Sequence, residues 1–233
     1  MPNQTLSFNN TDLLRTLILV PQGAEHKAVT KNFPQNHNLQ ISPTPIGCSS
    51  VDKYLQSLDH PQQYQQVIVM GLCGSLNPQL KVGDVVLYDS CMYEAQIFKC
   101  SPLFITLSIN SAKSPVKSPV QALTSDRLIH LASEKQTLYK STNCDVVDME
   151  GYAVLEFFSK LNIPVSMIRV VSDDASHDLP NLKTAIDQNG NLKPLELAIS
   201  FVKNPIAAIR LIRGSLKSLQ ILSQVSLILN QKN

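Results

Sequence analysis

Short apolar runs alternate with amphipathic stretches over the first third of the chain. Residues 13–20 (LLRTLILV) and 66–72 (QVIVMGL) are almost continuously apolar, which is typical of strands that a parallel sheet buries on both faces. A weaker strand is predicted at 39–45. Helices are predicted between these strands, at about 24–33 and from Ser50 to about Leu58, where the apolar positions share one helical face.

In the middle of the chain, the apolar residues no longer have the spacing of an amphipathic helix. Short runs at 84–89, 95–99 and 103–109 predict strands without helices between them, and the repeated SPVK/SPVQ at 114–121 predicts a proline-punctuated surface loop. Alternating elements then return: a helix at 126–139, a strand at 145–147, a helix at 150–161 and a strand at 165–171.

This order of elements predicts an α/β fold, a three-layer α/β/α sandwich around a mixed central sheet. The core is expected over about residues 13–178, and a C-terminal helical extension over about 195–233. No linker-like segment separates the two parts. A chain of 233 residues suits one domain of this type, so we expect residues 1–233 to form a single domain.

Composition narrows the classes of protein that fit. The net charge of +2 is too balanced for a protein whose main partner is a nucleic acid. The five cysteines are scattered and form no metal-ligand pattern, so we expect reduced thiols, no metal and a cytoplasmic protein. The start of the chain lacks the features of a signal peptide, and no apolar stretch is long enough to span a bilayer.

Polar residues follow the strands at three places, where α/β proteins bind their ligands. Gly71 and Gly74 follow the strand at 66–72, and they predict either a close approach of the backbone to a ligand or a plain tight turn. Asp148 and Glu150 lie between a strand and a helix. A carboxylate there can bind the two hydroxyls of a ribose, or it can simply cap the helix.

Two adjacent carboxylates follow the strand at 165–171. Like-charge repulsion and partial burial are expected to raise the pKa of at least one of them, Asp173 or Asp174, as a general acid near neutral pH requires. The alternative is an ordinary helix cap formed with Ser172. The pattern alone does not decide which of the two aspartates would be the acid.

Four segments together resemble the nucleoside phosphorylase superfamily, which includes purine nucleoside phosphorylases and 5'-methylthioadenosine/S-adenosylhomocysteine nucleosidases. They occur in the family's order, and each is similar to one of its signatures: LILVPQGAEHKAV (17–29), GLCGSLNPQLKVGDVV (71–86), VVDMEGYAV (146–154) and RVVSDDA (169–175). The resemblance implies a homo-oligomeric enzyme with this fold that cleaves the N-glycosidic bond of a purine nucleoside, with an adenine-type base favoured.

The resemblance also implies roles for individual residues. Asp173 would protonate N7 of the purine, with Ser172 steering it, and Glu25 would position the attacking water. Glu150 would bind the ribose hydroxyls while Met149 packs on the sugar. The glycine segment would complete the substrate-binding set with Gly71, Leu72 and Gly74.

One departure from the family bears on the nucleophile. Bacterial purine phosphorylases hold phosphate with an Arg and a Ser around the glycine segment, and the matching positions here are Val69 and Leu72. Water is therefore the expected nucleophile and no cofactor is expected, with phosphate as a co-substrate in the alternative. Two further alternatives stay open: a phosphorylase that acts on an adenosyl-lipid, and a nucleoside-binding paralogue without catalysis.

The C-terminal part suggests the lipid alternative. The segment AIDQNGNLKPLELAISFVKNPIAAIRL (185–211) resembles the tail of the hopanoid-associated phosphorylase branch. Within the helix expected over 205–229, Gly214 is a candidate break point. A basic stripe and an apolar face are expected there, formed by Lys203, Arg210, Arg213 and Lys217, and by Ile209, Ile212, Leu216, Leu219 and Leu222.

Two interpretations of this helix stay open. Its apolar side packs on the core or on a partner subunit, with the basic stripe in solvent. Alternatively, the helix rests on an anionic membrane surface.

Overall fold

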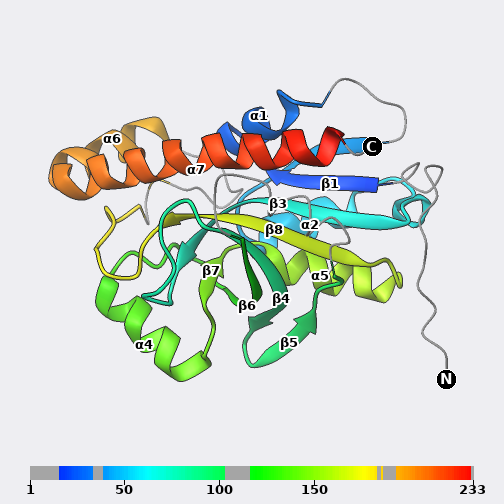
Figure 1. The fold of residues 1–233 in the computed structure, drawn as a ribbon, viewed down its shortest axis with the longest axis horizontal. Helices are drawn as coiled ribbons and strands as arrows, with labels where there is room; N and C mark the ends of the chain where they lie inside the picture. The colour runs from blue at the N-terminus through cyan, green and yellow to red at the C-terminus, as the bar shows by residue number, and fades with distance from the viewer. Residues whose placement is uncertain (1–15, 34–38, 103–115, 183–184, 186–192, 232–233) are drawn as a thin grey trace.

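Three layers make up the fold in a computed structural model, which describes residues 16–33, 39–102, 116–182, 185 and 193–231. Figure 1 shows α1 and α7 along one face of a central sheet, with α2 and α5 on the other side. The predicted α/β/α sandwich around a mixed sheet is therefore confirmed. The strand expected at 103–109 lies outside the described residues.

The elements follow one another in the expected alternation. The strands are β1 (Thr16–Pro21), β2 (Leu39–Thr44), β3 (Gln66–Ser75), β4 (Val85–Tyr93), β5 (Gln96–Lys99), β6 (Val116–Thr124), β7 (Val146–Asp148) and β8 (Val165–Asp173). The helices are α1 (Ala24–Thr30), α2 (Cys48–Gln56), the short 3-10 helix η2 (Pro61–Gln63), α4 (Ala132–Thr142), α5 (Gly151–Lys160), α6 (Pro194–Lys203) and α7 (Pro205–Gln231).

The pairing of the strands brings distant segments together. Along the sheet the order is β2-β1-β3-β7-β6-β4-β5, and β8 pairs with both β3 and β4. The strands β3, β7, β6, β4 and β8 thus form a closed circuit, and β1 joins it through a parallel pairing with β3. Strand β3 therefore has β1, β7 and β8 as its neighbours, which places the ends of four strands close together.

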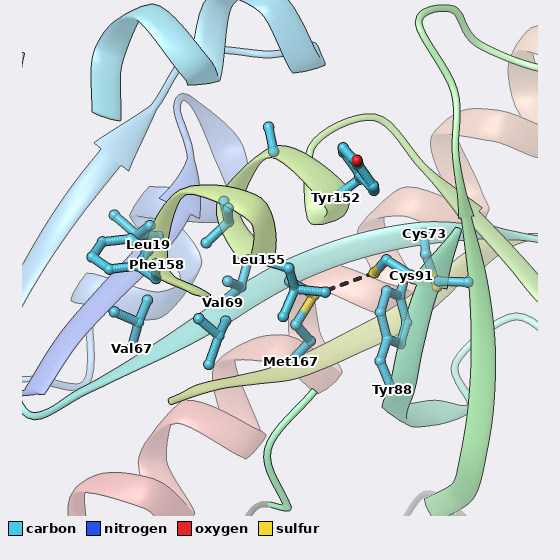
Figure 2. Packing of buried hydrophobic residues seen from close by; sticks show 14 of the residues in the cluster. Leu19, Val67, Val69, Cys73, Tyr88, Cys91, Tyr152, Leu155, Phe158 and Met167 are labelled. Carbon is cyan, nitrogen blue, oxygen red and sulfur yellow. Dashed lines mark hydrogen bonds between the residues drawn. The ribbon is translucent and has the colours of Figure 1, made fainter. Parts of the chain in front are cut away.

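Each face of the sheet has its own apolar core. On one face, Val51 and Leu55 of α2 and Leu155 and Phe158 of α5 pack against the sheet. Figure 2 shows this cluster, in which Cys91 Sγ donates a hydrogen bond to Met167 Sδ over 3.7 Å. The opposite core joins helices α1 and α7 to the sheet through Val29, Ile221, Leu222, Val225 and Leu229, packed on Ile18, Val20, Ile68, Met70, Ile168 and Val170.

Two turn or loop predictions are wrong. Gly71 and Gly74 lie within β3 rather than in a turn, because pairing with β8 extends this strand to Ser75. Residues 116–121 of the proline-punctuated segment belong to β6, not to a surface loop. The ladder with β4 passes from Lys117 to Val120 and skips Ser118 and Pro119, so the proline removes no ladder hydrogen bond there.

Helix α7 differs from its expected form in two ways. It is unbroken at Gly214, because that glycine packs against the backbone carbonyl of Ser172 and its missing side chain leaves room for the contact. The residues that it buries in its first half are small: Ala207, Ala208, Gly214 and Ser218. Of the apolar positions predicted for this helix, Leu222 is buried and Leu219 is half-buried, whereas Ile209, Ile212 and Leu216 are exposed on the chain itself. That a partner subunit or a membrane covers these three stays a prediction.

Candidate active site

A pocket opens where β1, β3, β7 and β8 end. Gly74 of β3 pairs with Val147 of β7 and with Asp173 of β8, so the segments after these strands meet at this glycine. The residues that line the pocket are Pro21, Glu25, Ile46, Leu72, Cys73, Gly74, Arg127, Leu128, Ile129, Val147, Asp148, Met149, Glu150, Ser172 and Asp173.

Glu25 comes from the first turn of α1 and reaches across to β3. The backbone N–H of Leu72 donates a hydrogen bond to Glu25 Oε1 over 2.6 Å. Burial raises the pKa of Glu25 from 4.5 to about 7, and Arg169 and the Leu72 N–H limit the rise. Glu25 is therefore a carboxyl group that can change its charge near neutral pH.

Arg169 lies beneath the pocket and is fully buried in β8, with no exposed surface. Its Nη2 lies 3.5 Å from Asp148 Oδ2 and 3.5 Å from Glu150 Oε2. Burial lowers the pKa of this guanidinium, but its neighbours, Asp148 first and then Tyr88, Glu150 and Glu25, outweigh it and hold the pKa above its ordinary value. A single cation thus balances several carboxyl groups in a site withdrawn from water.

Asp148 and Glu150 have different hydrogen-bond partners. Asp148 Oδ1 accepts hydrogen bonds from Thr124 Oγ1 and from the N–H of Gly151 at the start of α5, so Asp148 caps that helix. Glu150 occupies the N-cap position of α5, but its side chain makes no capping hydrogen bond. Glu150 Oε1 accepts a hydrogen bond from the N–H of Gly47 over 3.2 Å. Burial raises the pKa of Glu150, and Arg169 opposes this rise.

The two glycines of β3 make room for side chains of the site. A Cβ on Gly71 would lie 2.4 Å from Arg169 Nη1 and 2.7 Å from Glu25 Oε1. A Cβ on Gly74 would lie 2.9 Å from Asp173 Oδ2. A side chain at either position would therefore displace the end of a site side chain: Arg169 or Glu25 at Gly71, and Asp173 at Gly74. Gly71 does not itself line the pocket.

Asp173 ends β8 with its carboxyl group in the pocket. Ser172 Oγ donates a hydrogen bond to Asp173 Oδ1 over 2.8 Å. Lys135 of α4 forms an ion pair with Asp173 Oδ2, and the side chain of Asp173 is 10% exposed. Asp173 is thus held from both sides at the edge of the pocket.

Asp174 lies outside this arrangement. Its carboxyl group accepts hydrogen bonds from the N–H and Oγ of Ser176, and Oδ1 lies 2.8 Å from His177 Nδ1. Burial raises the pKa of Asp174, but these partners outweigh it and lower the pKa below its ordinary value. The raised pKa expected from two adjacent carboxylates is therefore not found at Asp174.

The structure places most of the sequence-predicted residues in one pocket. Glu25, Leu72, Gly74, Met149, Glu150, Ser172 and Asp173 all line it. Val69 does not, because its side chain is buried in the apolar core on the α2/α5 face of the sheet. Residues 126–131, expected to be helical, form a loop instead, and Arg127, Leu128 and Ile129 of this loop line the pocket.

Sequence reasoning missed two cations of the site. Arg169 interrupts an apolar strand, and a buried charge needs partners, so the sequence contained a signal for it. Lys135 carried no such signal, because a lysine in a polar helix is usually exposed. Within the described ranges no group of His, Cys, Asp and Glu side chains has the arrangement that a metal ion needs, and no helix has the length and apolar character to cross a membrane.

Comparison with solved structures shows the same fold in several enzymes. The 5'-methylthioadenosine/S-adenosylhomocysteine nucleosidase of Helicobacter pylori superposes with a TM-score of 0.68 at 16% identity, covering 94% of this chain and 99% of that one. Futalosine hydrolase of H. pylori gives 0.68 at 15% identity, with coverages of 94% and 99%. The S-adenosylhomocysteine nucleosidase of Streptococcus pyogenes gives 0.68 at 16%, with coverages of 94% and 98%.

The family comparison covers most of the chain. No curated protein sequence matches it. A family model described as "Phosphorylase superfamily" matches residues 16–134 and 111–203, which together include every residue that lines the pocket. The chain therefore belongs to the phosphorylase superfamily and is an enzyme that acts on N-glycosidic bonds.

Proposed function

We propose that this enzyme hydrolyses the N-glycosidic bond of a purine nucleoside with an adenine-type base. The observation that carries the proposal is the meeting of Glu25, Glu150 and Asp173 in one pocket. The names of the similar nucleosidases, which refer to methylthioadenosine and S-adenosylhomocysteine, support the choice of an adenine-type base.

Asp173 acts on the leaving group in this proposal. A purine departs poorly as an anion, so a proton delivered to N7 while the C–N bond stretches stabilises the departing base. Asp173 is the carboxyl group at the pocket edge, and the hydrogen bond from Ser172 fixes the orientation of its side chain. Loss of the base leaves an oxocarbenium-like sugar cation.

Glu150, Met149 and Glu25 act on the sugar and on water. Glu150 accepts hydrogen bonds from the ribose hydroxyls, and Met149 packs on the ring. The carboxyl groups of the pocket stabilise the positive charge of the sugar. Glu25, in its carboxylate form, orients the attacking water and takes up its proton, and its pKa of about 7 suits that exchange.

The charges around Arg169 favour water over phosphate as the nucleophile. Asp148, Glu150 and Glu25 surround this guanidinium, so a phosphate dianion would meet carboxyl groups on its approach. Arg127 also lines the pocket, but its guanidinium forms an ion pair with Glu134. Leu72 supplies an apolar side chain where a phosphate ligand would be expected.

Product analysis tests the proposal. The protein is incubated with adenosine, methylthioadenosine and inosine, with and without phosphate, and the sugar product is identified. We expect the free base and the free sugar without phosphate, and faster cleavage of the adenine nucleosides than of inosine. Strict dependence on phosphate with a sugar 1-phosphate as product would identify a phosphorylase, and binding without cleavage would identify a nucleoside-binding paralogue.

We also propose a peripheral membrane contact through the outer face of α6 and α7. This face is defined here as Leu195, Ile199, Val202, Ile206, Ile209, Ile212 and Leu216, all exposed, with Ile206 72% and Leu216 58% exposed. Lys203 lies beside Ile199, and Arg210, Arg213 and Lys217 lie beside Ile206 and Ile209, with Lys217 Nζ donating a hydrogen bond to the carbonyl of Val82. Helix α7 contains no acidic residue. An apolar ridge flanked by cations complements an anionic bilayer surface.

A second copy of the chain fits this face less well than an anionic membrane does. Pairing two such faces would bring the cations of α7 close to one another, which costs free energy. The homo-oligomer that the family resemblance implies is therefore proposed to form through another surface. Sedimentation of the purified protein measures its oligomeric state.

A further inference from the structure

Helix α4 buries a lysine where a helix of this kind would bury an apolar residue. Among its described residues, Ala132–Thr142, Lys135 is the buried one, and its side chain has no exposed surface. Removing an ammonium group from water costs several kcal/mol unless an opposite charge and hydrogen bonds compensate for it. The position of Lys135 therefore depends on the groups that its ammonium meets.

Those groups belong to the end of β8. Lys135 Nζ forms an ion pair with Asp173 Oδ2, and it donates a hydrogen bond to the backbone carbonyl of Asp174 over 2.8 Å. Ser172 Oγ donates to the other oxygen, Asp173 Oδ1. Both oxygens of Asp173 thus accept hydrogen bonds, and the nearest formal charge is the ammonium of Lys135.

This arrangement raises a chemical problem for the proposed acid. A carboxylate paired with an ammonium is ionised, and an ionised carboxylate cannot donate a proton to a leaving group. The proton has to come from a neighbouring donor before or while the base departs. Lys135 is such a donor, already hydrogen-bonded to Asp173 and shielded from solvent.

We propose that Lys135 is a positioning residue that holds Asp173 and supplies its proton, an inference that rests on the proposed function. As the C–N bond breaks, its electron pair stays on the base. An N–H bond of Lys135 breaks as an O–H bond forms on Asp173. That O–H bond then breaks as the same proton forms the N7–H bond of the departing base. Lys135 is left as a neutral amine beside the Asp173 carboxylate. The proton of the attacking water passes through Glu25 to solvent, and a solvent proton returns to Lys135 by way of the Asp173 carboxyl group, which is 10% exposed.

Other charged groups near this pair are already partnered. Asp174 is held by His177, and Arg127 by Glu134. Across the pocket, Arg169 lies among the carboxyl groups of Asp148, Glu150 and Glu25. The thiol of Cys73, also in the pocket lining, has its pKa raised by burial and stays neutral.

The pH dependence of turnover tests the proposal. Lys135→Met removes the ammonium but keeps an unbranched side chain, and Lys140→Met, at an exposed position of the same helix, is the matched control. Without Lys135, Asp173 has to take its proton from solvent, which becomes harder as pH rises. We expect kcat to fall less than about threefold near pH 5.5 and more than about tenfold near pH 8, with KM almost unchanged. A loss that is equal at all pH values, or absent, would overturn the proposal.

A further measurement separates the relay from a general loss of folding. In an Asp173→Asn background, Lys135→Met should cost less than about twofold more, because Lys135 acts through Asp173. If the wild type cleaves no purine nucleoside, the proposed function fails and the relay with it; if it cleaves but these results are absent, only the relay fails.

Discussion

Asp173 and Asp174 are adjacent in the chain, yet their carboxyl groups have different surroundings. Asp173 lines the pocket between Ser172 and Lys135, whereas Asp174 turns toward Ser176 and His177. The sequence could not show which of the two carboxyl groups enters the pocket. Side chains alternate between the faces of a sheet only within a strand, and β8 ends at Asp173. Their side-chain partners distinguish the two carboxyl groups. We therefore expect an Asp→Asn substitution to have different effects on activity at the two positions.

Asp173→Asn should lower kcat at least 100-fold, which corresponds to about 3 kcal/mol of lost transition-state stabilisation. Substrate affinity should change much less, because an amide still occupies the same space. Asp174→Asn is the control and should keep most of the activity. Steady-state kinetics with the best nucleoside substrate measures both. Near-normal turnover in Asp173→Asn, with a severe loss in Asp174→Asn, would reverse the assignment.

Glu25 makes the stability of the protein depend on pH. Its pKa is raised from 4.5 to about 7 in the folded protein, so the folded state binds more protons between these values. The contribution of the neutral carboxyl group is complete below about pH 4.5 and is lost as pH rises through about 7. A buried side chain that cannot ionise, such as glutamine, would not show this loss of stability with rising pH.

Glu25→Gln should therefore stabilise the protein relative to the wild type at pH 8 by on the order of 2 kcal/mol, and by far less at pH 5. The glutamine oxygen can still accept the N–H of Leu72, so that hydrogen bond is kept. Urea unfolding at the two pH values measures the difference. Glu156→Gln, at a more exposed glutamate of α5, serves as control. A stability difference that is the same at both pH values would contradict the burial of an ionisable Glu25.

At the scale of elements, helix α7 is joined directly to the strand that carries the proposed acid. Ser218 Oγ donates a hydrogen bond to the carbonyl of Val171 over 2.6 Å, and Gly214 faces the carbonyl of Ser172. A Cβ on Gly214 would lie 2.3 Å from that oxygen, which is far inside normal contact. The absence of a side chain here sets how closely the helix approaches β8.

Gly214→Ala should destabilise the protein by about 1–3 kcal/mol through overpacking against the backbone. This reverses the usual effect in a helix interior, where alanine is favoured over glycine by about 1 kcal/mol. It should also lower kcat, because the displaced carbonyl precedes Asp173. Urea unfolding and kinetics measure the two effects. Gln220→Ala, at an exposed position of α7, should leave both unchanged, and a stabilised Gly214→Ala variant would show that the contact is looser than described.

The pattern of apolar residues predicts much of the fold but not the ends of its elements. Strands β3 and β8 are nearly continuous apolar runs, and their burial makes them easy to locate. The extension of β3 through Gly71 and Gly74 could not be predicted, because it depends on pairing with a strand about 100 residues later. The strand at 116–121 was missed for the same reason: Pro119 within it suggests a loop, and its pairing partner β4 lies about 30 residues earlier in the chain.

The sequence predicts the site residues that belong to family motifs. It does not predict the roles of buried residues that contact those residues from outside the pocket. Glu25, Glu150 and Asp173 belong to segments that resemble the family. Arg169 lies within such a segment, but its role as the shared partner of buried carboxyl groups depends on three-dimensional packing. Lys135 reaches the pocket from α4, and no property of the sequence distinguishes it from the exposed Lys140.

At the scale of the whole molecule, the outer face of α6 and α7 gives a prediction about membranes. The protein should float with vesicles that contain anionic lipid at low salt, be released at high salt, and ignore neutral vesicles. Each Lys or Arg near such a surface contributes about 1 kcal/mol, so Arg213→Glu should weaken binding about tenfold or more. Ile206→Ser combined with Ile209→Ser should weaken it by reducing apolar contact.

The control for flotation is Gln224→Glu, which changes the charge of α7 at an exposed position beyond the outer face. Point substitutions are preferred to removal of the helix, because Leu222, Val225 and Leu229 of α7 belong to the core. Equal flotation of the wild type and the substituted proteins, or no flotation of the wild type at low salt, would contradict the membrane contact. A concentration-dependent dimer lost in Ile206→Ser with Ile209→Ser would instead indicate a second copy on this face.

Helix α7 is synthesised after every strand of the sheet that it covers. One face of the sheet receives its helices α2 and α5 by residue 160, whereas the other is covered by α1 together with a helix made after all the strands. Asn32 Nδ2 bonds to Ser223 Oγ across 191 residues of sequence. A nascent chain on the ribosome therefore exposes Ile18, Val20, Ile68 and Met70 until α7 emerges. Such an uncovered apolar sheet favours aggregation and binding by chaperones until α7 has been synthesised and covers it.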